Sequence, residues 1–378
     1  MRRAVDFALE HYLTLPLGGL IAVVWANTYS VSYFRTAEAL TFLVNDVGMA
    51  VVLAYLMQEV LEAALPGGSL HGWRRTIVPT VAAAGGVAGA VATYAGYISA
   101  GDEEVLARGW PIAIGVDVLL CVAIARSIFR RTAAVTFALS IALASDAVGL
   151  AIISRRDFAT REHPEAVALL AAAVVAAVVF RKSRVRSLWP YLGVSGVLSW
   201  IACYDGGLHP ALALLPIVPF MAHAPRNLNA DRERSSVHAP ANHLERVFRF
   251  PVQAIAFFVG LVNAGISIRG YGTGTWAVAA AALLGRPIGM LIGTGIALAV
   301  GLHLPRGVRG TDVAMCAVAA SPSATFGLFM AAAVFPSGPL LIETRIGSLL
   351  TILAWPAALA VAYLLRAGRF GDAFAGRA

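Results

Sequence analysis

TAAVTFALSIALASDAVGLAII, residues 132–153, is a run of apolar and small residues with one charged side chain, Asp146, near its middle. About 20 such residues are enough for a helix to cross roughly 30 Å of hydrocarbon. A carboxylate at that depth is costly, so it marks a functional site by default. The run therefore predicts a membrane-spanning helix that carries a site residue.

The composition of the whole chain agrees with this reading. Of the 378 residues, 59% are hydrophobic and 13% are charged, and the mean hydropathy is +0.75. Soluble domains average about 45–50% apolar and roughly 25% charged residues. These values exclude a soluble α/β enzyme and a disordered or disulfide-stapled chain. Long apolar runs in place of short alternating strands also exclude an outer-membrane barrel.

Further apolar stretches complete an all-α polytopic membrane protein with about twelve transmembrane helices, in one transporter domain over residues 1–378. The predicted spans are 13–33, 43–64, 76–99, 109–127, 131–153, 166–181, 187–204, 209–223, 249–268, 274–301, 312–335 and 345–366. The longest polar segment, 224–248, is predicted as a cytoplasmic linker.

Basic residues set the predicted orientation. If the N-terminus is cytoplasmic, the inner segments hold 21 Lys and Arg and the outer loops hold seven. This bias favours cytoplasmic N- and C-termini. It also explains the net charge of +8 without nucleic acid as a partner. No Walker-type loop or H-E-x-x-H sequence is present, so the sequence predicts no cofactor.

Three more charged residues lie inside apolar runs: Asp46, Asp117 and Arg286. A buried carboxylate such as Asp146 can hold either a proton or a hard cation in turn. The alternative is a structural aspartate paired with an arginine. Arg286 keeps its proton, so it needs an acid or a helix-dipole end as partner. It is either a counter-ion for Asp146 or Asp117 that a transported cation displaces, or a permanent structural bridge.

Two predicted spans are interrupted at matching places. Pro111 and Gly115 precede Asp117 in one span, and Pro322 precedes Thr325 in the other. Interrupted helices in the two halves of a transporter mark its binding site, because they expose carbonyl groups and dipole ends near the midplane. Two packing kinks are the simpler alternative.

Other polar residues have weaker functional readings. Asp46 lies at the start of a span, where it can cap a helix. Glu59 lies at the cytoplasmic end of that span, in a cation-attracting mouth or a solvated end. His209 either titrates near neutral pH or is an interfacial histidine without a role. Glu245 belongs to the polar linker, where a solvated side chain is the default.

Several segments, in order, resemble sodium/proton antiporters of the NhaA type over nearly the whole chain. They are Asn45-Asp46, Gly67-Gly68-Ser69-Leu70, Gly109-Trp110-Pro111 through Asp117, Ser145-Asp146 with Gly149, Gly207 to Ala211, His243-Leu244-Glu245, Asn263-Ala264-Gly265-Ile266-Ser267 and Gly285-Arg286-Pro287-Ile288-Gly289. The resemblance implies twelve helices, with inverted repeats over 76–153 and 276–366 and two broken helices that cross near the midplane.

The resemblance also implies roles for matching residues. Asp146 matches the main ion and proton carrier, and Asp117 matches the aspartate that compensates the dipole ends of the broken helices. Asp46 matches a family aspartate of the second span, and His209 matches a histidine linked to the pH response. Glu59 and Glu245 match acids near the cytoplasmic funnel.

The sequence differs from the family pattern at several positions, and these differences suggest a hypothesis about the number of ions exchanged. Ser145 replaces the first aspartate of the family pair, Arg286 replaces a lysine, and Val116 replaces a threonine. Glu62-Ala63 stands in place of an Arg-Glu pair, and Ser321-Pro322-Ser323 in place of a Gly-rich stretch. A buried lysine can release a proton, whereas an arginine keeps it. Asp146 then remains as the one titrating carrier, which predicts electroneutral exchange of one Na+ or Li+ for one H+. The predicted ion- and proton-binding residues are Asp146, Asp117 and Ser145, with the two aspartates as ligands of the cation and Arg286 as the counter-charge.

Alternative functions stay open at this point. The same fold could transport K+ or another solute, or act as a sensor without transport. An intramembrane aspartyl protease would use Asp117 and Asp146, but its Gly-x-Gly-Asp type signature is absent here. The predicted partners are monovalent cations, protons and membrane lipid. Residues 34–42 form only a short predicted loop where the family has a dimerisation hairpin, so a homodimer is open. The predicted location is the bacterial inner membrane.

Overall fold

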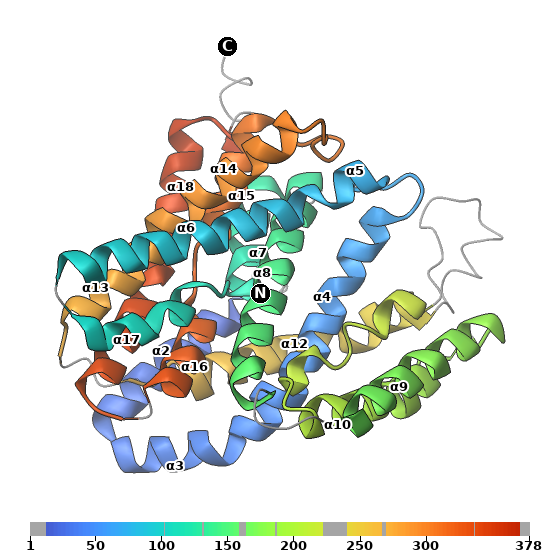
Figure 1. The fold of residues 1–378 in the computed structure, drawn as a ribbon, viewed down its shortest axis with the longest axis horizontal. Helices are drawn as coiled ribbons and strands as arrows, with labels where there is room; N and C mark the ends of the chain where they lie inside the picture. Colours follow the sequence, from blue (N-terminus) through green and yellow to red (C-terminus); the bar gives the residue numbers. More distant parts are fainter. Residues whose placement is uncertain are drawn as a thin grey trace, which may run out of the picture. The chain divides into compact units, whose positions relative to one another are not determined.

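Figure 1 shows the computed structural model, which describes residues 13–101, 103–130, 132–158, 164–185, 187–221, 240–266, 270–335 and 337–370. Side chains are not described for 151–158, 240–243, 245, 246 and 249. The described residues form helices joined by turns, with no strand among them. The predicted all-α fold class is confirmed.

Contacts divide the chain into two compact units. Unit 1 comprises Met1–Ala39, Ser69–Gly149 and Ala256–Ala378, and unit 2 comprises Leu40–Gly68 and Leu150–Ile255. Apart from the end of the first one, both predicted repeats (76–153 and 276–366) lie within unit 1. Their inverted relation stays a prediction.

Unit 1 contains most of the helices. They are α2 (Thr14–Thr28), most of α3 (Ser30–Thr41), α5 (Trp73–Thr76), α6 (Val78–Ala100), the 3-10 helix η2 (Glu104–Ala113), α7 (Val118–Phe129), most of α8 (Ala133–Phe158), α13 (Thr273–Ala280), the π-helix η6 (Ala281–Gly285), α14 (Arg286–Ala299), α15 (Gly310–Ala319), α16 (Ala324–Val334), α17 (Pro339–Leu350), the 3-10 turn η7 (Thr351–Leu353) and α18 (Ala354–Leu364).

Unit 2 contains the remaining elements. They are the π-helix η1 (Phe42–Gly48), α4 (Met49–Ala64), α9 (Pro164–Lys182), the π-helix η3 (Tyr191–Gly196), α10 (Val197–Asp205), the 3-10 turns η4 (Pro210–Leu212) and η5 (Val218–Phe220), and most of α12 (Pro240–Asn263). Its core is built from Ala54 of α4, Ala173 and Ala177 of α9, Tyr191 of η3 and Leu244 of α12.

Within the described residues, six helices are long and apolar enough to cross a membrane: Ser30–Ala64, Trp73–Ala100, Ala133–Leu150, Pro164–Lys182, Thr273–Ala299 and Pro339–Leu364. Two bent helix pairs raise the number to eight. The structure is thus that of a polytopic membrane protein. The count of twelve spans stays a prediction.

Two predicted segments differ in the structure. The span predicted over 209–223 is absent in its described part, which holds only the turns η4 and η5. Prolines at 210, 216 and 219 remove the N–H groups that a continuous helix needs. The predicted loop 34–42 is helical instead, because no Gly or Pro interrupts it. The predicted linker 224–248 lies outside the described residues up to 239 and is part of α12 from Pro240.

Helices α6 and α14 pack closely through glycines. A Cβ atom added at Gly89 or Gly289 would lie within 3.0 Å of backbone atoms on the facing helix, and Gly85 and Gly293 are placed in the same way. Small residues at four-residue spacing let membrane helices approach backbone to backbone. This contact fixes α14, whose first residue is Arg286, against α6.

We expect Gly289→Ala to destabilise the protein by about 1–3 kcal/mol, because the added methyl group must push two backbones apart. The midpoint of heat-induced aggregation in detergent measures this loss. Gly295→Ala, in the same helix with no atom within 4 Å of the added Cβ, is the matched control. Equal midpoints for the two variants would contradict the close packing.

Candidate ion-binding site

Two helices of unit 1 are broken at the places that the sequence predicts. Helices η2 and α7 meet at 55° around residues 114–117, and α15 and α16 meet at 47° around residues 320–323. Pro111 and Pro322 have no backbone N–H, so neither can donate a helical hydrogen bond. Each break leaves helix-end carbonyl and N–H groups that need other partners.

The two breaks lie against each other. The backbone N–H of Asp117 donates to the carbonyl of Pro322 at 2.8 Å. The Ser323 hydroxyl donates to the carbonyl of Ile112 at 3.3 Å, and its backbone N–H donates to the Thr351 hydroxyl at 2.9 Å. The ends of four half-helices therefore gather in one buried place.

Asp117 joins two helix N-termini. Its Oδ1 atom accepts from the N–H of Leu120 at 3.2 Å in the first turn of α7. Its Oδ2 atom accepts from the N–H of Thr325 at 3.1 Å and from the Thr325 hydroxyl at 2.6 Å, at the start of α16. A negative charge is favourable at the positive ends of two helix dipoles. The Asp117 carboxylate thus has three donors.

Arg286 lies at the C-terminal ends of two half-helices, whereas Asp117 lies at N-terminal ends. Its side chain is 0% exposed and donates to the carbonyl of Ser321, at 2.7 Å, and to the carbonyl of Ala113. These carbonyls lie at the C-termini of α15 and η2, where a positive charge is favourable. Within the described part of the chain, no carboxylate lies within 4.0 Å of the guanidinium. The arginine thus bridges dipole ends, one of the two partner types that the sequence predicts.

Asp146 lies beside the first break, on α8. It is buried, and its Oδ1 atom accepts one hydrogen bond, from the N–H of Val116 at 2.9 Å. Its Oδ2 atom accepts none from the described residues. The hydroxyl of Ser145 next to it is buried and has no hydrogen-bond partner among them either. Two oxygen atoms that prefer hard cations or protons are therefore available on consecutive residues.

Gly115 and Gly149 make room for an aromatic ring. A side chain at either position would overlap with the ring of Phe326 in α16. The glycines before Asp117 and after Asp146 therefore let α16 pack closely beside both acids.

We expect Thr325→Val to remove one charge-assisted hydrogen bond from Asp117, worth about 1.5–3 kcal/mol. The thermal midpoint in detergent should fall by several degrees. Thr294→Val is the control, because that buried hydroxyl donates only to the carbonyl of Met290 in its own helix. An unchanged midpoint for Thr325→Val would show that the cap adds little stability.

Other predicted site residues belong to unit 2. The Asp46 carboxylate lies 3.9 Å from Nε2 of His209, whose Nδ1 accepts from the N–H of Ala211. Asp46 lies within the π-helix η1. Glu59 lies on α4, near its end, and is partly buried. The side chain of Glu245 lies outside the described residues. The functional roles of these four residues stay predictions.

Sequence reasoning missed some participants. The carbonyls of Ala113 and Ser321, which hold Arg286, cannot be read from side-chain identity. Thr351 and Phe326 are ordinary residues of apolar helices, and only the fold brings them to the breaks. The one available signal for Ser321 and Phe326 was their position next to Pro322 and Thr325, at the predicted break of the second interrupted span.

Comparison with known proteins identifies the family to which the chain belongs. The family model described as "Na+/H+ antiporter 1" matches residues 14–365. The chain belongs to this antiporter family. A Na(+)/H(+) antiporter NhaA of Geobacter metallireducens is 33% identical over 98% of this chain and 100% of its own length. A Na(+)/H(+) antiporter NhaA of Desulfitobacterium hafniense is 32% identical over 96% of each chain.

Membership of the antiporter family decides between a transporter and an enzyme. The chain is a transporter of a secondary antiport family and not an enzyme, which removes the protease reading of Asp117 and Asp146. It also confirms the resemblance inferred from the ordered motifs. The roles that the resemblance implies for Ser145 and Arg286 stay predictions.

Proposed function

We propose that this protein exchanges Na+ or Li+ for H+ across the bacterial inner membrane, with Asp146 as the shared carrier of cation and proton. The family match and the antiporter relatives support Na+/H+ exchange as the reaction class. The observation that carries the choice of Asp146 is that its Oδ2 atom accepts no hydrogen bond from the described residues. The hydroxyl of the preceding residue in the helix, Ser145, also has no hydrogen-bond partner among them.

Asp117 is the weaker candidate for the carrier. Its carboxylate already accepts three hydrogen bonds from two helix N-termini, which favour the ionised form. Protonation would remove the negative charge and weaken these three hydrogen bonds. Asp117 therefore serves as a fixed anion that holds the broken helices, and it contributes negative potential to an approaching cation.

Charge counting supports one-for-one exchange. Arg286 stays a cation in every step, because guanidinium does not release its proton in proteins. Ser145 does not titrate. Asp146 is neutral when it carries a proton and forms a neutral pair when it carries Na+ or Li+. The loaded site thus has the same charge in both directions of transport, and no net charge crosses the membrane.

The proposed oxygen ligands of the cation lie on α8 and at the first helix break. The free carboxylate oxygen of Asp146 and the Ser145 hydroxyl supply two, and water or main-chain carbonyls supply the others that Na+ needs. The arginine bias of the loops supports the orientation with both termini in the cytoplasm.

Proton flux in proteoliposomes tests the proposal. Na+, Li+ or K+ is added with the membrane potential clamped at zero and at a negative value. A signal driven by Na+ or Li+ that ignores voltage is the expected result. A voltage-dependent signal would contradict one-for-one exchange. A response to K+ alone, or to none of these cations, would favour transport of another solute or a sensor.

A further inference from the structure

A basic pocket of unit 1 lies away from the ion-binding site. It is formed where the segment before α6 meets the loop between α14 and α15, and it has a volume of about 260 Å³. Its lining residues are His71, Gly72, Trp73, Arg74, Arg75 and His303. The N–H of His303 donates to the carbonyl of Arg74, and the N–H of Arg306 donates to the carbonyl of Ser69. The two walls of the pocket are thus joined by main-chain hydrogen bonds.

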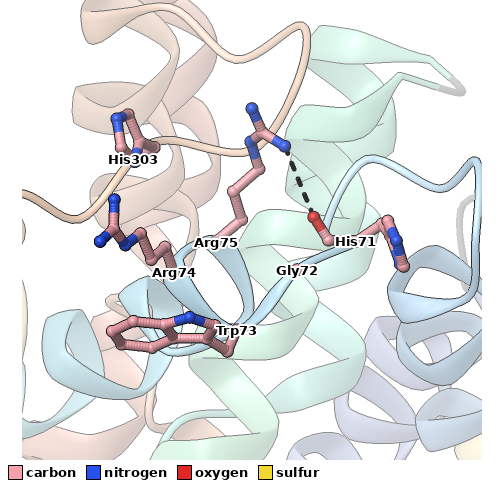
Figure 2. Close-up of a pocket in the computed structure, with 6 residues that line it drawn as sticks. All are labelled: His71, Gly72, Trp73, Arg74, Arg75 and His303. Atoms are coloured by element: carbon pink, nitrogen blue, oxygen red, sulfur yellow. Dashed lines mark hydrogen bonds between the residues drawn. The ribbon is translucent and has the colours of Figure 1, made fainter.

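Cationic side chains converge at this place. Figure 2 shows the guanidinium groups of Arg74 and Arg75 on the side of the segment that faces His303, whereas the imidazole of His71 points away. The guanidinium of Arg74 lies 5.4 Å from the centre of the Trp73 ring. Arg75 makes one long hydrogen bond, of 3.5 Å, to the carbonyl of His71.

The positive charge of the pocket is not neutralised by the described residues. No carboxylate lines it, and neither arginine forms an ion pair with an acid in the described part of the chain. The Nε atom of Arg75 is buried without a hydrogen-bond partner there. Two unpaired guanidinium groups with unused N–H donors match the oxygens of a phosphate group.

Neighbouring apolar residues indicate the source of that phosphate. Trp73 begins the candidate membrane span Trp73–Ala100 and is 69% exposed, and Ile77, one turn further on, is 42% exposed. Exposed tryptophan at the end of a span is typical of the level of lipid headgroups. Basic pockets at the ends of spans bind anionic headgroups. A lipid can place its phosphate on the arginines and its acyl chains along the apolar start of α6.

We propose that this pocket binds the phosphate group of an anionic phospholipid. The bound headgroup bridges Arg74 and Arg75 to His303, and so braces the start of α6 against the α14–α15 loop. This inference does not depend on the proposed exchange reaction, because binding is measured without transport.

Lipid binding to the full-length protein in detergent tests the proposal. Dioctanoyl phosphatidylglycerol, dioctanoyl phosphatidylcholine and inorganic phosphate are titrated separately, and bound adducts are counted by native mass spectrometry. We expect saturable binding of phosphatidylglycerol and at least tenfold weaker binding of the other two. Arg74→Gln with Arg75→Gln should weaken phosphatidylglycerol binding at least tenfold. Arg74→Lys with Arg75→Lys should restore part of it.

A matched control removes the same charge elsewhere. Arg366→Gln with Arg369→Gln deletes two arginines from the same predicted side of the membrane, outside the pocket, and should leave binding unchanged. Equal losses in both double variants, or no loss in the pocket variant, would overturn the site. Equally tight binding of inorganic phosphate would overturn the lipid as its ligand. Thermal midpoints of all variants verify that they are folded.

Discussion

Asp146→Asn is expected to abolish Na+-driven proton flux. The amide keeps the size of the side chain and can still accept the hydrogen bond from Val116. It cannot take up a proton at working pH, nor neutralise a cation. Leaving a buried ion without its counter-charge costs about 3–5 kcal/mol, which corresponds to a loss of 100-fold or more. Flux in proteoliposomes should therefore fall to the level of vesicles without protein.

Two controls make this result specific. Asp205→Asn changes an exposed aspartate on α10 in the same way and should leave flux unchanged. Stabilisation of the detergent-purified protein by added Na+ gives a second readout, and it should disappear in Asp146→Asn. If the variant kept both flux and stabilisation by Na+, another group would carry the ion.

The second large effect concerns voltage. Ser145→Asp combined with Arg286→Lys restores a second acid and a cation that can release its proton. Two protons would then exchange for one cation, so that each cycle moves one net charge. One charge in a potential of 100 mV is worth about 2.3 kcal/mol, or about a 50-fold change in the steady-state Na+ gradient. The native protein should show no such change.

The single variants separate the two contributions. Arg286→Lys alone tests whether a cation that can release its proton is enough to make transport depend on voltage. Ser145→Asp alone tests whether a second carboxylate is enough. An active double variant that still ignored voltage would contradict the charge-counting argument. Flux at zero potential shows that each variant is active before its voltage response is compared.

The apolar helices and the two helix breaks were predictable from the sequence. The apolar runs predicted helices correctly because backbone groups in lipid must be satisfied within the helix. Pro111 and Pro322 marked both breaks because proline removes a helical donor. The prediction over 209–223 was wrong, since hydropathy counted its apolar residues but not the effect of its three prolines.

The contacts of the site were less predictable. The sequence suggested that Arg286 needs an acid or a dipole end, but only the structure shows the carbonyls of Ala113 and Ser321. It likewise suggested roles for Asp117 and Asp146 without showing that one carboxylate has three donors and the other has one. Side-chain identity does not reveal which main-chain groups are free, because this depends on how two distant breaks meet.

The bonds across the two breaks also have a mechanical consequence. Asp117 ties the start of α7 to α16, and Arg286 ties the end of η2 to the end of α15. No half-helix can tilt alone without stretching a bond to another one. We therefore expect the four half-helices to move together as one stiff unit, with bending confined to the segments that connect them to the rest of the chain.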